Sequence, residues 1–305
     1  MAKQNRQTIS YLTKRFREVG LEPNRRHGQN FLIDLNLIEL LAESASLTPD
    51  DVVLEVGTGT GSLTGLLAAK AAHVVTVEID QHLHQLAQEE LEEFENITFL
   101  HQDALKNKNN FHPTVLETIQ KQMAAHAGSI FKLGANLPYN IATPVISNLL
   151  RCPIVPEVMS VTIQKELADR IVAEPNNKDY GALSVWIQSL CDAEIVRIMK
   201  PSVFWPSPKV DSAIVRIAHR PDKRAQFPDL EFFHRFSRAI FFHRRKFLRS
   251  VAISAFKEEL NKPQVDEVLA EMQLGPQART EQLSVEELQA LCELFRKKVN
   301  EVAAG

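Results

Sequence analysis

Four consecutive residues, Asn136-Leu137-Pro138-Tyr139, bring together groups that suit the recognition of a nucleobase. They follow a short apolar run over 130–135, so we expect them where a strand ends and the chain turns. An amide oxygen and a backbone carbonyl accept the two protons of an exocyclic amine, and an aromatic ring stacks on a flipped-out base. Asn and Pro are also ordinary turn residues, so these four residues alone leave a plain turn as the alternative.

A glycine-rich turn lies upstream of these residues. An apolar strand predicted over 52–56 leads into Gly57-Thr58-Gly59-Thr60-Gly61, and a helix is predicted over 62–70. A second apolar run, 74–77, ends on Glu78, about 20 residues past the glycines, where an acid accepts hydrogen bonds from the hydroxyls of a ribose. The pattern predicts a nucleoside site, with a merely tight strand-to-helix turn as the alternative.

The spacing of the glycines indicates which nucleoside cofactor fits. A dinucleotide fingerprint, G-x-G-x-x-G, would place its third glycine at position 62, which is Ser62, whereas the third glycine here is Gly61. No Gly-Lys-Ser/Thr follows that would mark a phosphate-binding loop. The spacing therefore favours a cofactor with a ribose and an adenine but no phosphates. S-adenosylmethionine fits that description, and a dehydrogenase cofactor does not.

A third polar residue follows a third strand, predicted over 97–100. The carboxylate of Asp103 is able to accept a hydrogen bond from the adenine amine of the cofactor, although it is equally able to cap the segment that follows. Open α/β sheets bind ligands outside the carboxyl ends of their strands. Asp103, Glu78 and Asn136 each follow a predicted strand, which favours a shared site.

The order of the predicted elements indicates an α/β protein with a doubly wound, mainly parallel sheet. A fifth strand is predicted over 158–163, and two later strands, 195–199 and 213–217, would add an antiparallel strand. After Pro221 the strand signals end and the chain reads as helical, so we place a domain boundary near residue 220. The predicted domains are 1–220, with a basic N-terminal extension over 1–30, and 221–305. Residues 106–128 read as a long polar connection without an assigned function.

Composition describes an ordinary globular protein. The chain has 305 residues, of which 44% are hydrophobic and 24% charged. No apolar run approaches the length of a membrane helix, and the N-terminus has no apolar segment typical of a secretory signal. The three cysteines lie far apart, which indicates a reducing compartment and no structural zinc. We expect a cytoplasmic protein that binds no metal and no membrane.

The net charge of −3 hides two basic regions. Residues 1–27 contain seven Lys or Arg against two Glu, and residues 232–256 contain six Lys or Arg and no acid. The second region is interleaved with phenylalanines that we expect on the core side of helices; they are Phe232, Phe233, Phe236, Phe241, Phe242 and Phe247. A basic stripe over an apolar underside predicts a polyanion-binding surface, with a solvated charged face as the alternative.

Together these blocks resemble the ribosomal RNA adenine N6-dimethyltransferases, and within them the small-subunit (16S) enzymes. The resemblance covers nearly the whole chain, through 29–32, 55–61, Glu78, Asp103, 136–139, 180–185, 204–212 and 244–249. It implies a Rossmann-like class I methyltransferase fold with a seven-stranded sheet and a small all-helical C-terminal domain that binds RNA. It also implies transfer of methyl groups to the N6 amines of two adjacent adenines near the 3′ end of small-subunit ribosomal RNA, during ribosome biogenesis.

The resemblance also implies a role for individual residues. In the cofactor site, Asn30 and Leu32 would hold the methionine end and the lip, Gly57 the wall, Glu78 the ribose and Asp103 the adenine. Asn136 is expected in this site as well as in the substrate site. In the substrate site, Asn136 and the Leu137 carbonyl would grip the target amine, Pro138 would make the turn rigid, and Tyr139 and Phe204 would stack on the two faces of the adenine. Arg244, Arg245, Lys246 and Arg249 would contact RNA. The expected partner is small-subunit ribosomal RNA in a pre-assembled small subunit, bound by a monomer.

Phe247 and Ser250 depart from the polar or asparagine residues expected in the basic block, which leaves the finer RNA contacts open. Two rival functions remain. Large-subunit RNA methylases of the macrolide-resistance type share the catalytic blocks, and a non-catalytic ribosome-assembly factor would share the fold. DNA adenine methylases usually have Asp where this chain has Asn136.

Overall fold

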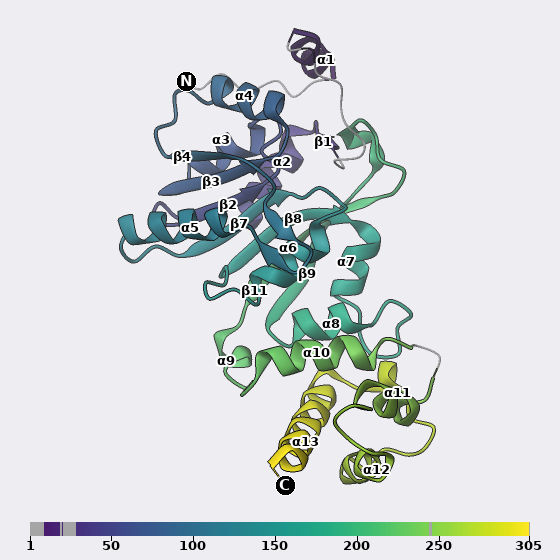
Figure 1. Cartoon of the computed structure of the whole chain (residues 1–305). Coiled ribbons are helices and arrows are strands. Elements are labelled where there is room, and N and C mark those ends of the chain that lie inside the picture. Colours follow the sequence, from purple (N-terminus) through teal and green to yellow (C-terminus); the bar gives the residue numbers. More distant parts are fainter. Residues whose placement is uncertain (1–8, 19, 21–28, 244–245, 305) are drawn as a thin grey trace. The chain divides into compact units, whose positions relative to one another are not determined.

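The computed structural model describes residues 9–18, 20, 29–243 and 246–304 (Figure 1). Its contacts divide the chain into two compact units, Met1–Ala168 with Glu194–His219, and Asp169–Ala193 with Arg220–Gly305. The second unit thus contains residues 169–193, which a single boundary near residue 220 assigns to the sheet domain. Within the described residues, no helix has both the length and the apolar character needed to span a membrane.

A seven-stranded sheet with the order β4-β3-β2-β7-β8-β11-β9 organises the first unit (Figure 1). The strands from β4 to β8 in this order are parallel, and β11 pairs antiparallel with β8, which places Ser212 opposite Gln164. The predicted doubly wound, mainly parallel sheet with an antiparallel addition is therefore confirmed. The strands are β2 (Val52–Val56), β3 (His73–Glu78), β4 (Ile97–His101), β7 (Phe131–Asn136), β8 (Val158–Gln164), β9 (Cys191–Met199) and β11 (Ser212–His219).

Helices connect these strands, and two of them begin at an aspartate cap. Asp34 accepts the backbone N–H groups of the first turn of α2, and Asp80 does the same for α4, which satisfies donors that have no partner within the helix. Both caps follow a strand directly or within two residues, so they set where each helix leaves the sheet edge. The helices are α2 (Leu35–Ser44), α3 (Ser62–Ala68), α4 (Gln81–Glu90), α5 (Pro113–Ala125), α6 (Ala142–Leu149) and α7 (Lys165–Ile171).

Residues 106–128, expected to be a long polar connection, instead form regular structure. A short hairpin of β5 (Leu105–Asn107) and β6 (Asn110–Phe111) is followed by α5. Val115 and Ile119, four residues apart, are fully buried and α5 packs on β2 and β3. The connection is polar in sequence because only one face of this crossover helix is apolar, and its polar face dominates the sequence.

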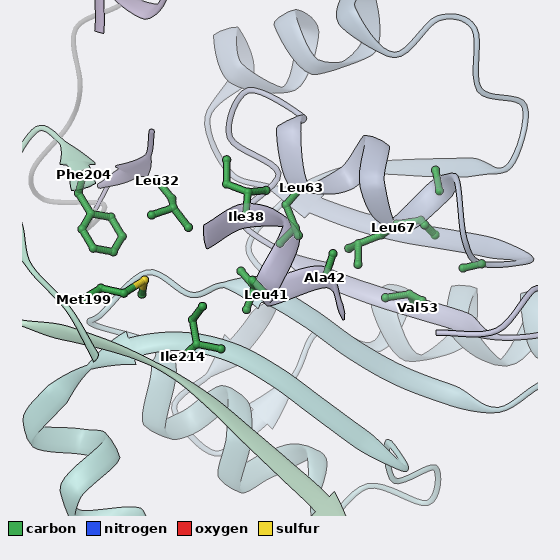
Figure 2. Packing of buried hydrophobic residues seen from close by; sticks show 13 residues of the cluster. Leu32, Ile38, Leu41, Ala42, Val53, Leu63, Leu67, Met199, Phe204 and Ile214 are labelled. Carbon is green, nitrogen blue, oxygen red and sulfur yellow. The ribbon is translucent and has the colours of Figure 1, made fainter. Parts of the chain in front are cut away.

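One hydrophobic cluster joins α2, α3 and the sheet (Figure 2). Leu41 of α2, Leu67 of α3 and Val53 of β2 are completely buried in it. Leu32 and Phe204 belong to the same cluster, and their backbones pair antiparallel as part of a two-stranded sheet. The cluster thereby fixes the chain around residue 32 against the main sheet. The two short strands are β1 (Phe31–Leu32) and β10 (Phe204–Trp205), and a 3₁₀ helix, η2 (Pro201–Val203), precedes β10.

The predicted N-terminal extension lies partly outside the described residues. Its helix α1 (Ile9–Glu18) places the Phe16 ring 5.2 Å from the Phe31 ring and 5.4 Å from the Trp205 ring. Arg15 forms an ion pair of 2.8 Å with Glu90 at the end of α4. These contacts anchor α1 on β1, β10 and α4.

The second unit is helical, as predicted for the chain beyond Pro221. Aromatic rings form much of its core, and Phe256 and Phe295 stack with ring centroids 4.4 Å apart. Trp186 of α8 contacts His234 of α10, with ring centroids 4.6 Å apart. The helices are α8 (Ala182–Gln188), α9 (Pro221–Arg224), α10 (Leu230–Ile240), α11 (Leu248–Ala255), α12 (Lys262–Glu271) and α13 (Val285–Ala304), with a 3₁₀ helix, η3 (Thr280–Gln282), before α13.

Two of the six phenylalanines expected on the core side of this unit are not in the core. Phe242 is 77% exposed and Phe247 is 42% exposed, whereas the other four are buried. The helix α10 ends at Ile240, so the periodicity that places Phe232, Phe233 and Phe236 on the buried face does not extend to residue 242. The expectation for Phe242 and Phe247 was wrong because both lie in the connection between α10 and α11.

Candidate functional site

A cavity opens at the carboxyl ends of β2, β3 and β7, within the first unit. Nine of the ten residues predicted for catalysis or cofactor binding line it, although they come from segments more than a hundred residues apart. Among the residues that the structure describes, no lysine or arginine lines the cavity. The nine residues are Asn30, Leu32, Gly57, Glu78, Asp103, Asn136, Leu137, Pro138 and Tyr139.

Gly57 forms the wall between the glycine-rich turn and the segment 136–139. Its φ of +88° lies in the left-handed region that other residues rarely adopt. A Cβ at this position would also meet the Pro138 ring at 3.4 Å. The Gly57 N–H donates to the Val77 carbonyl oxygen at 2.8 Å, so the turn is tied to β3. A side chain at residue 57 would therefore strain the turn and narrow the cavity.

The Glu78 carboxylate is held in place by three backbone N–H groups. Gly59 donates to Oε2 at 2.9 Å, and Ile79 and Asp80 donate to Oε1 at 2.9 Å and 3.0 Å. Burial raises the pKa of Glu78, and the N–H groups of Asp80 and Gly59 oppose that rise by favouring the charged form. The result is a fixed hydrogen-bond acceptor at the end of β3, next to the glycine-rich turn.

Glu55, which the sequence analysis did not single out, lies fully buried in β2 and also lines the cavity. The hydroxyls of Thr64 and Thr76 each donate to its Oε2 at 2.6 Å, and the Thr58 hydroxyl lies 2.6 Å from that of Thr76. Burial raises the pKa of Glu55 to about 8, so the acid is mostly protonated at neutral pH. The signal in the sequence was an acid inside an otherwise apolar strand.

Asp103 lines the cavity and is exposed. Its Oδ1 accepts the N–H of Leu105 at 2.8 Å, and the element that follows is the strand β5. Asp103 therefore stabilises a turn, since no helix begins there for it to cap. One carboxylate oxygen is used in this turn, and the carboxylate stays accessible to a ligand.

The Asn136 amide has a defined orientation at the end of β7. Its Nδ2 donates to the backbone carbonyl oxygen of Asn30 at 2.9 Å. Only the amide nitrogen is able to donate to a carbonyl, so Oδ1 faces away from Asn30 as an acceptor. The next residue is fixed by the N–H of Leu137, which donates to the Thr162 carbonyl oxygen of β8 at 3.2 Å.

Tyr139 is anchored at its hydroxyl. The Oη atom lies 2.5 Å from Oγ of Ser212, the fully buried first residue of β11. Burial raises the pKa of Tyr139, so the hydroxyl stays protonated at neutral pH. Phe204, by contrast, is 2% exposed and packs in the cluster with Leu32 (Figure 2). The structure therefore brings Tyr139 to the cavity and leaves Phe204 in the core.

The four residues predicted to contact RNA lie in or next to the connection between α10 and α11. Arg244 and Arg245 lie outside the described residues. Lys246 is exposed, and Arg249 forms a bidentate ion pair with Asp266, at 2.6 Å and 2.8 Å. Across the described ranges, no three His, Cys, Asp or Glu side chains are grouped so that they could hold a metal ion.

The residues around the cavity suit a phosphate-free nucleoside. Carboxylates at Glu78 and Asp103 are acceptors for ribose hydroxyls and for the adenine amine. Within the described part of the chain the lining contains no Lys or Arg, and this disfavours a pyrophosphate group, whose charge would need compensation. The cavity also places the Asn136 amide oxygen beside this nucleoside site, as a nucleobase amine would require.

Comparisons with known proteins agree over most of the chain. The family described as ribosomal RNA adenine dimethylase matches residues 20–297. The ribosomal RNA small subunit methyltransferase A of Clostridium acetobutylicum is 37% identical over 274 residues, which are 90% of this chain and 94% of the relative. The protein of the same name from Streptococcus equi subsp. zooepidemicus is 36% identical over 279 residues, 91% of this chain and 93% of the relative.

Two solved structures have similar folds. A dimethyladenosine transferase from Plasmodium falciparum superimposes with a TM-score of 0.72, covering 87% of this chain and 97% of that one, at 23% identity. At this identity the likeness concerns the fold. The 23S rRNA methyltransferase ErmE superimposes with a TM-score of 0.62 at 27% identity, covering 87% of this chain and 99% of that one.

Proposed function

Because the chain belongs to the ribosomal RNA adenine dimethylase family, we propose that it methylates two adjacent adenines near the 3′ end of small-subunit ribosomal RNA. The methyl groups come from S-adenosylmethionine, and the product is N6,N6-dimethyladenosine, formed during ribosome biogenesis. The observation that supports this function most strongly is the oriented Asn136 amide. Its oxygen is kept as an acceptor beside a nucleoside site whose described lining residues include acidic side chains and no Lys or Arg.

In this proposal, different residues of the cavity bind different parts of the cofactor. Glu78 accepts hydrogen bonds from the ribose hydroxyls, and Asp103 accepts from the adenine amine. Asn30 and Leu32 hold the methionine end, and Gly57 provides a wall without a side chain. When bound, S-adenosylmethionine supplies a methyl group already activated on a sulfonium. The three N–H groups on Glu78 keep the carboxylate oriented before the cofactor arrives.

The substrate residues activate and align a poor nucleophile. The lone pair of an adenine amine is delocalised into the ring. Asn136 Oδ1 and the Leu137 carbonyl oxygen accept hydrogen bonds from the two N–H groups of this amine. These hydrogen bonds draw the nitrogen toward tetrahedral geometry and free the lone pair. Pro138 keeps this turn rigid and Tyr139 stacks on the base, so alignment supplies most of the catalysis and no general base is required before transfer.

A second methyl transfer requires the monomethylated amine to bind again. The monomethylated amine has one N–H instead of two, so one of the two acceptors is sufficient to hold it. The first methyl group then lies where the second N–H pointed before. We propose that the cavity accommodates this group. Isolation of monomethyladenosine as the sole product would contradict it.

The small-subunit assignment is supported by identity. Relatives named ribosomal RNA small subunit methyltransferase A are 36–37% identical over 90–91% of the chain. The proposal also includes a pre-assembled small subunit as the substrate, a location in the cytoplasm, and a monomeric enzyme.

Tritium transfer from labelled S-adenosylmethionine to small ribosomal subunits that lack the modification tests this function. Nucleoside analysis should find the label in dimethyladenosine, and Asn136→Ala should abolish it. Label in large-subunit RNA would favour the resistance-type activity instead. No label in either RNA would overturn the proposed activity in favour of a non-catalytic assembly factor.

A further inference from the structure

Phe242 is the most exposed large hydrophobic side chain in the described part of the chain. It is 77% exposed, whereas the next most exposed, Ile9 and Ile198, are at 49%. Its N–H donates to the Ala239 carbonyl oxygen at 3.2 Å, so the backbone continues the last turn of α10 and projects the ring from a fixed base. A phenyl ring held in water gains free energy from any partner that covers it.

A second ring, that of Phe247, lies nearby. The described residues Phe242, His243, Lys246 and Phe247 are called the 242–247 turn below, and Arg244 and Arg245 lie outside the described residues and are not part of it. Phe247 precedes α11, is 42% exposed, and has the guanidinium of Arg279 5.5 Å from its ring centroid. The N–H of Lys246 donates to the His243 carbonyl oxygen at 3.1 Å and closes the turn. The 242–247 turn thus carries two exposed aromatic rings and one exposed lysine, Lys246.

The charge around this turn is positive. Residues 232–256 contain six Lys or Arg and no acid. Within the described residues of that range, Arg235 pairs with Glu259 and Arg249 with Asp266, while Arg238 and Lys246 form no ion pair. The surface therefore complements a polyanion that also offers a flat apolar face.

We propose that Phe242 stacks on an unpaired base of the RNA substrate while Lys246 contacts a neighbouring phosphate. The inference rests on the proposed function and specifies which part of the RNA the 242–247 turn recognises. In an RNA duplex the base faces are covered by their neighbours, so a phenyl ring finds a base to stack on only in a loop, bulge or end. Stacking on an aromatic side chain is worth about 5- to 150-fold in affinity per base.

Equilibrium binding of the full chain to unmodified small subunits tests this inference. Phe242→Ala should weaken binding about 5- to 150-fold, and Phe242→Leu should weaken it nearly as much because an aliphatic side chain does not stack. Phe242→Trp should bind at least as tightly as the wild type. Val302→Ala, which truncates another exposed apolar side chain of the same helical unit, should bind normally. Wild-type affinity for Phe242→Ala or Phe242→Leu would overturn the stacking role.

The salt dependence separates the ring from the charge. Phe242→Ala should leave the slope of log affinity against log salt unchanged, because stacking releases no counterions. Lys246→Ala should flatten that slope by about 0.7 to 0.9 if it removes one phosphate contact. A change of slope in Phe242→Ala would mean that the variant loses phosphate contacts, which contradicts the proposal.

Two further readouts separate this inference from its alternatives. Methyl transfer by the wild-type protein into small-subunit RNA reports on the proposed function. If the wild-type protein transfers methyl groups and Phe242→Ala binds RNA normally, only the stacking role is overturned. The emission of Phe242→Trp should shift on adding RNA. A shift with vesicles containing anionic phospholipid, and none with RNA, would assign the turn to a membrane surface and overturn the proposal.

Discussion

The cavity at the strand ends and the 242–247 turn both present polar and aromatic groups, but they hold them differently. In the cavity, Glu78, Asn136 and Tyr139 each form a hydrogen bond with another segment of the chain. In the turn, Phe242 and Lys246 project into solvent. Groups fixed before the ligand arrives contribute to catalysis, because alignment is already made. Exposed side chains that no second segment positions lose rotamer freedom on binding, so we expect their contribution to be to affinity.

The largest loss of activity is expected on substituting Asn136, and its absence would contradict the catalytic role of the fixed groups. Asn136→Ala removes an acceptor for the amine and the tie to Asn30, and a misplaced substrate costs on the order of 100-fold or more in rate. Single-turnover methyl transfer at saturating S-adenosylmethionine measures the rate, and calorimetry with the cofactor separately measures any loss of affinity that follows from releasing Asn30. Asn136→Asp should also be slow, since a carboxylate is unable to donate to the Asn30 carbonyl. A normal rate in either variant would remove Asn136 from the mechanism.

Substitution of Glu78 should weaken binding of the cofactor and leave binding of RNA unchanged. Glu78→Ala should weaken S-adenosylmethionine binding by about 10- to 150-fold, the usual range for hydrogen bonds to a charged group, and leave RNA affinity unchanged. The carboxylate is the binding form and burial raises its pKa, so affinity is present above that pKa and falls as the pH drops through it. Glu78→Gln should bind weakly with little pH dependence. Calorimetry across pH 4 to 8 checks both results, and unchanged affinity in Glu78→Ala would exclude the ribose contact.

The elements that position the cavity were predictable because buried parallel strands appear as continuous apolar runs, each followed by a glycine, acid or amide. The parallel register then brings those strand ends to one edge. Nothing local indicates the contact between Tyr139 and Ser212, which are 73 residues apart in the sequence. The buried site of Phe204 likewise depends on the pairing of β1 with β10.

The remaining differences come from tertiary context. An acid in a buried strand, such as Glu55, is visible in the sequence, but its partners Thr64 and Thr76 are set by how α3 and β3 pack on β2. The polar face of α5 concealed a crossover helix, and the end of α10 at Ile240 turned Phe242 outward. The end of a helix is difficult to predict to within two residues. Phe242 lies two residues past the end of α10, and this difference decided whether its ring was expected to be buried.

Glu55 provides a test of how firmly the cavity is built. Its pKa of about 8 in the folded chain exceeds the ordinary value of 4.5, so the folded state keeps a proton that the unfolded state loses. The stabilisation is complete below pH 4.5 and is lost as the pH rises through about 8, at roughly 1.4 kcal/mol per pH unit between these limits.

Glu55→Gln mimics the protonated acid and should therefore show a flatter pH dependence of the unfolding free energy than the wild type. Urea unfolding of both proteins without cofactor, from pH 5 to 9, gives the difference directly. Parallel pH profiles for the two proteins would mean that Glu55 is not protonated in the fold.

Ser212 should have a smaller effect, through Tyr139. Ser212→Ala removes the partner of the Tyr139 hydroxyl, and Tyr139→Phe removes the same hydrogen bond from the other side. Each should lower kcat by about 2- to 10-fold, the usual worth of one neutral hydrogen bond, with cofactor affinity unchanged. The double variant should be no slower than either single one, because both remove one interaction. Multiplicative losses would show that the two residues act separately.

The smallest effect is expected at the exposed ion pair of Arg249 and Asp266. Asp266→Asn should leave the Tm nearly unchanged, since exposed ion pairs contribute little to stability. It should tighten RNA binding slightly, because Arg249 is then released to meet a phosphate. Arg249→Ala should instead flatten the salt dependence of RNA binding by about 0.7 to 0.9 in slope. A marked fall in Tm for Asp266→Asn would mean that this pair holds α11 against α12, and that the basic surface is as firmly built as the cavity.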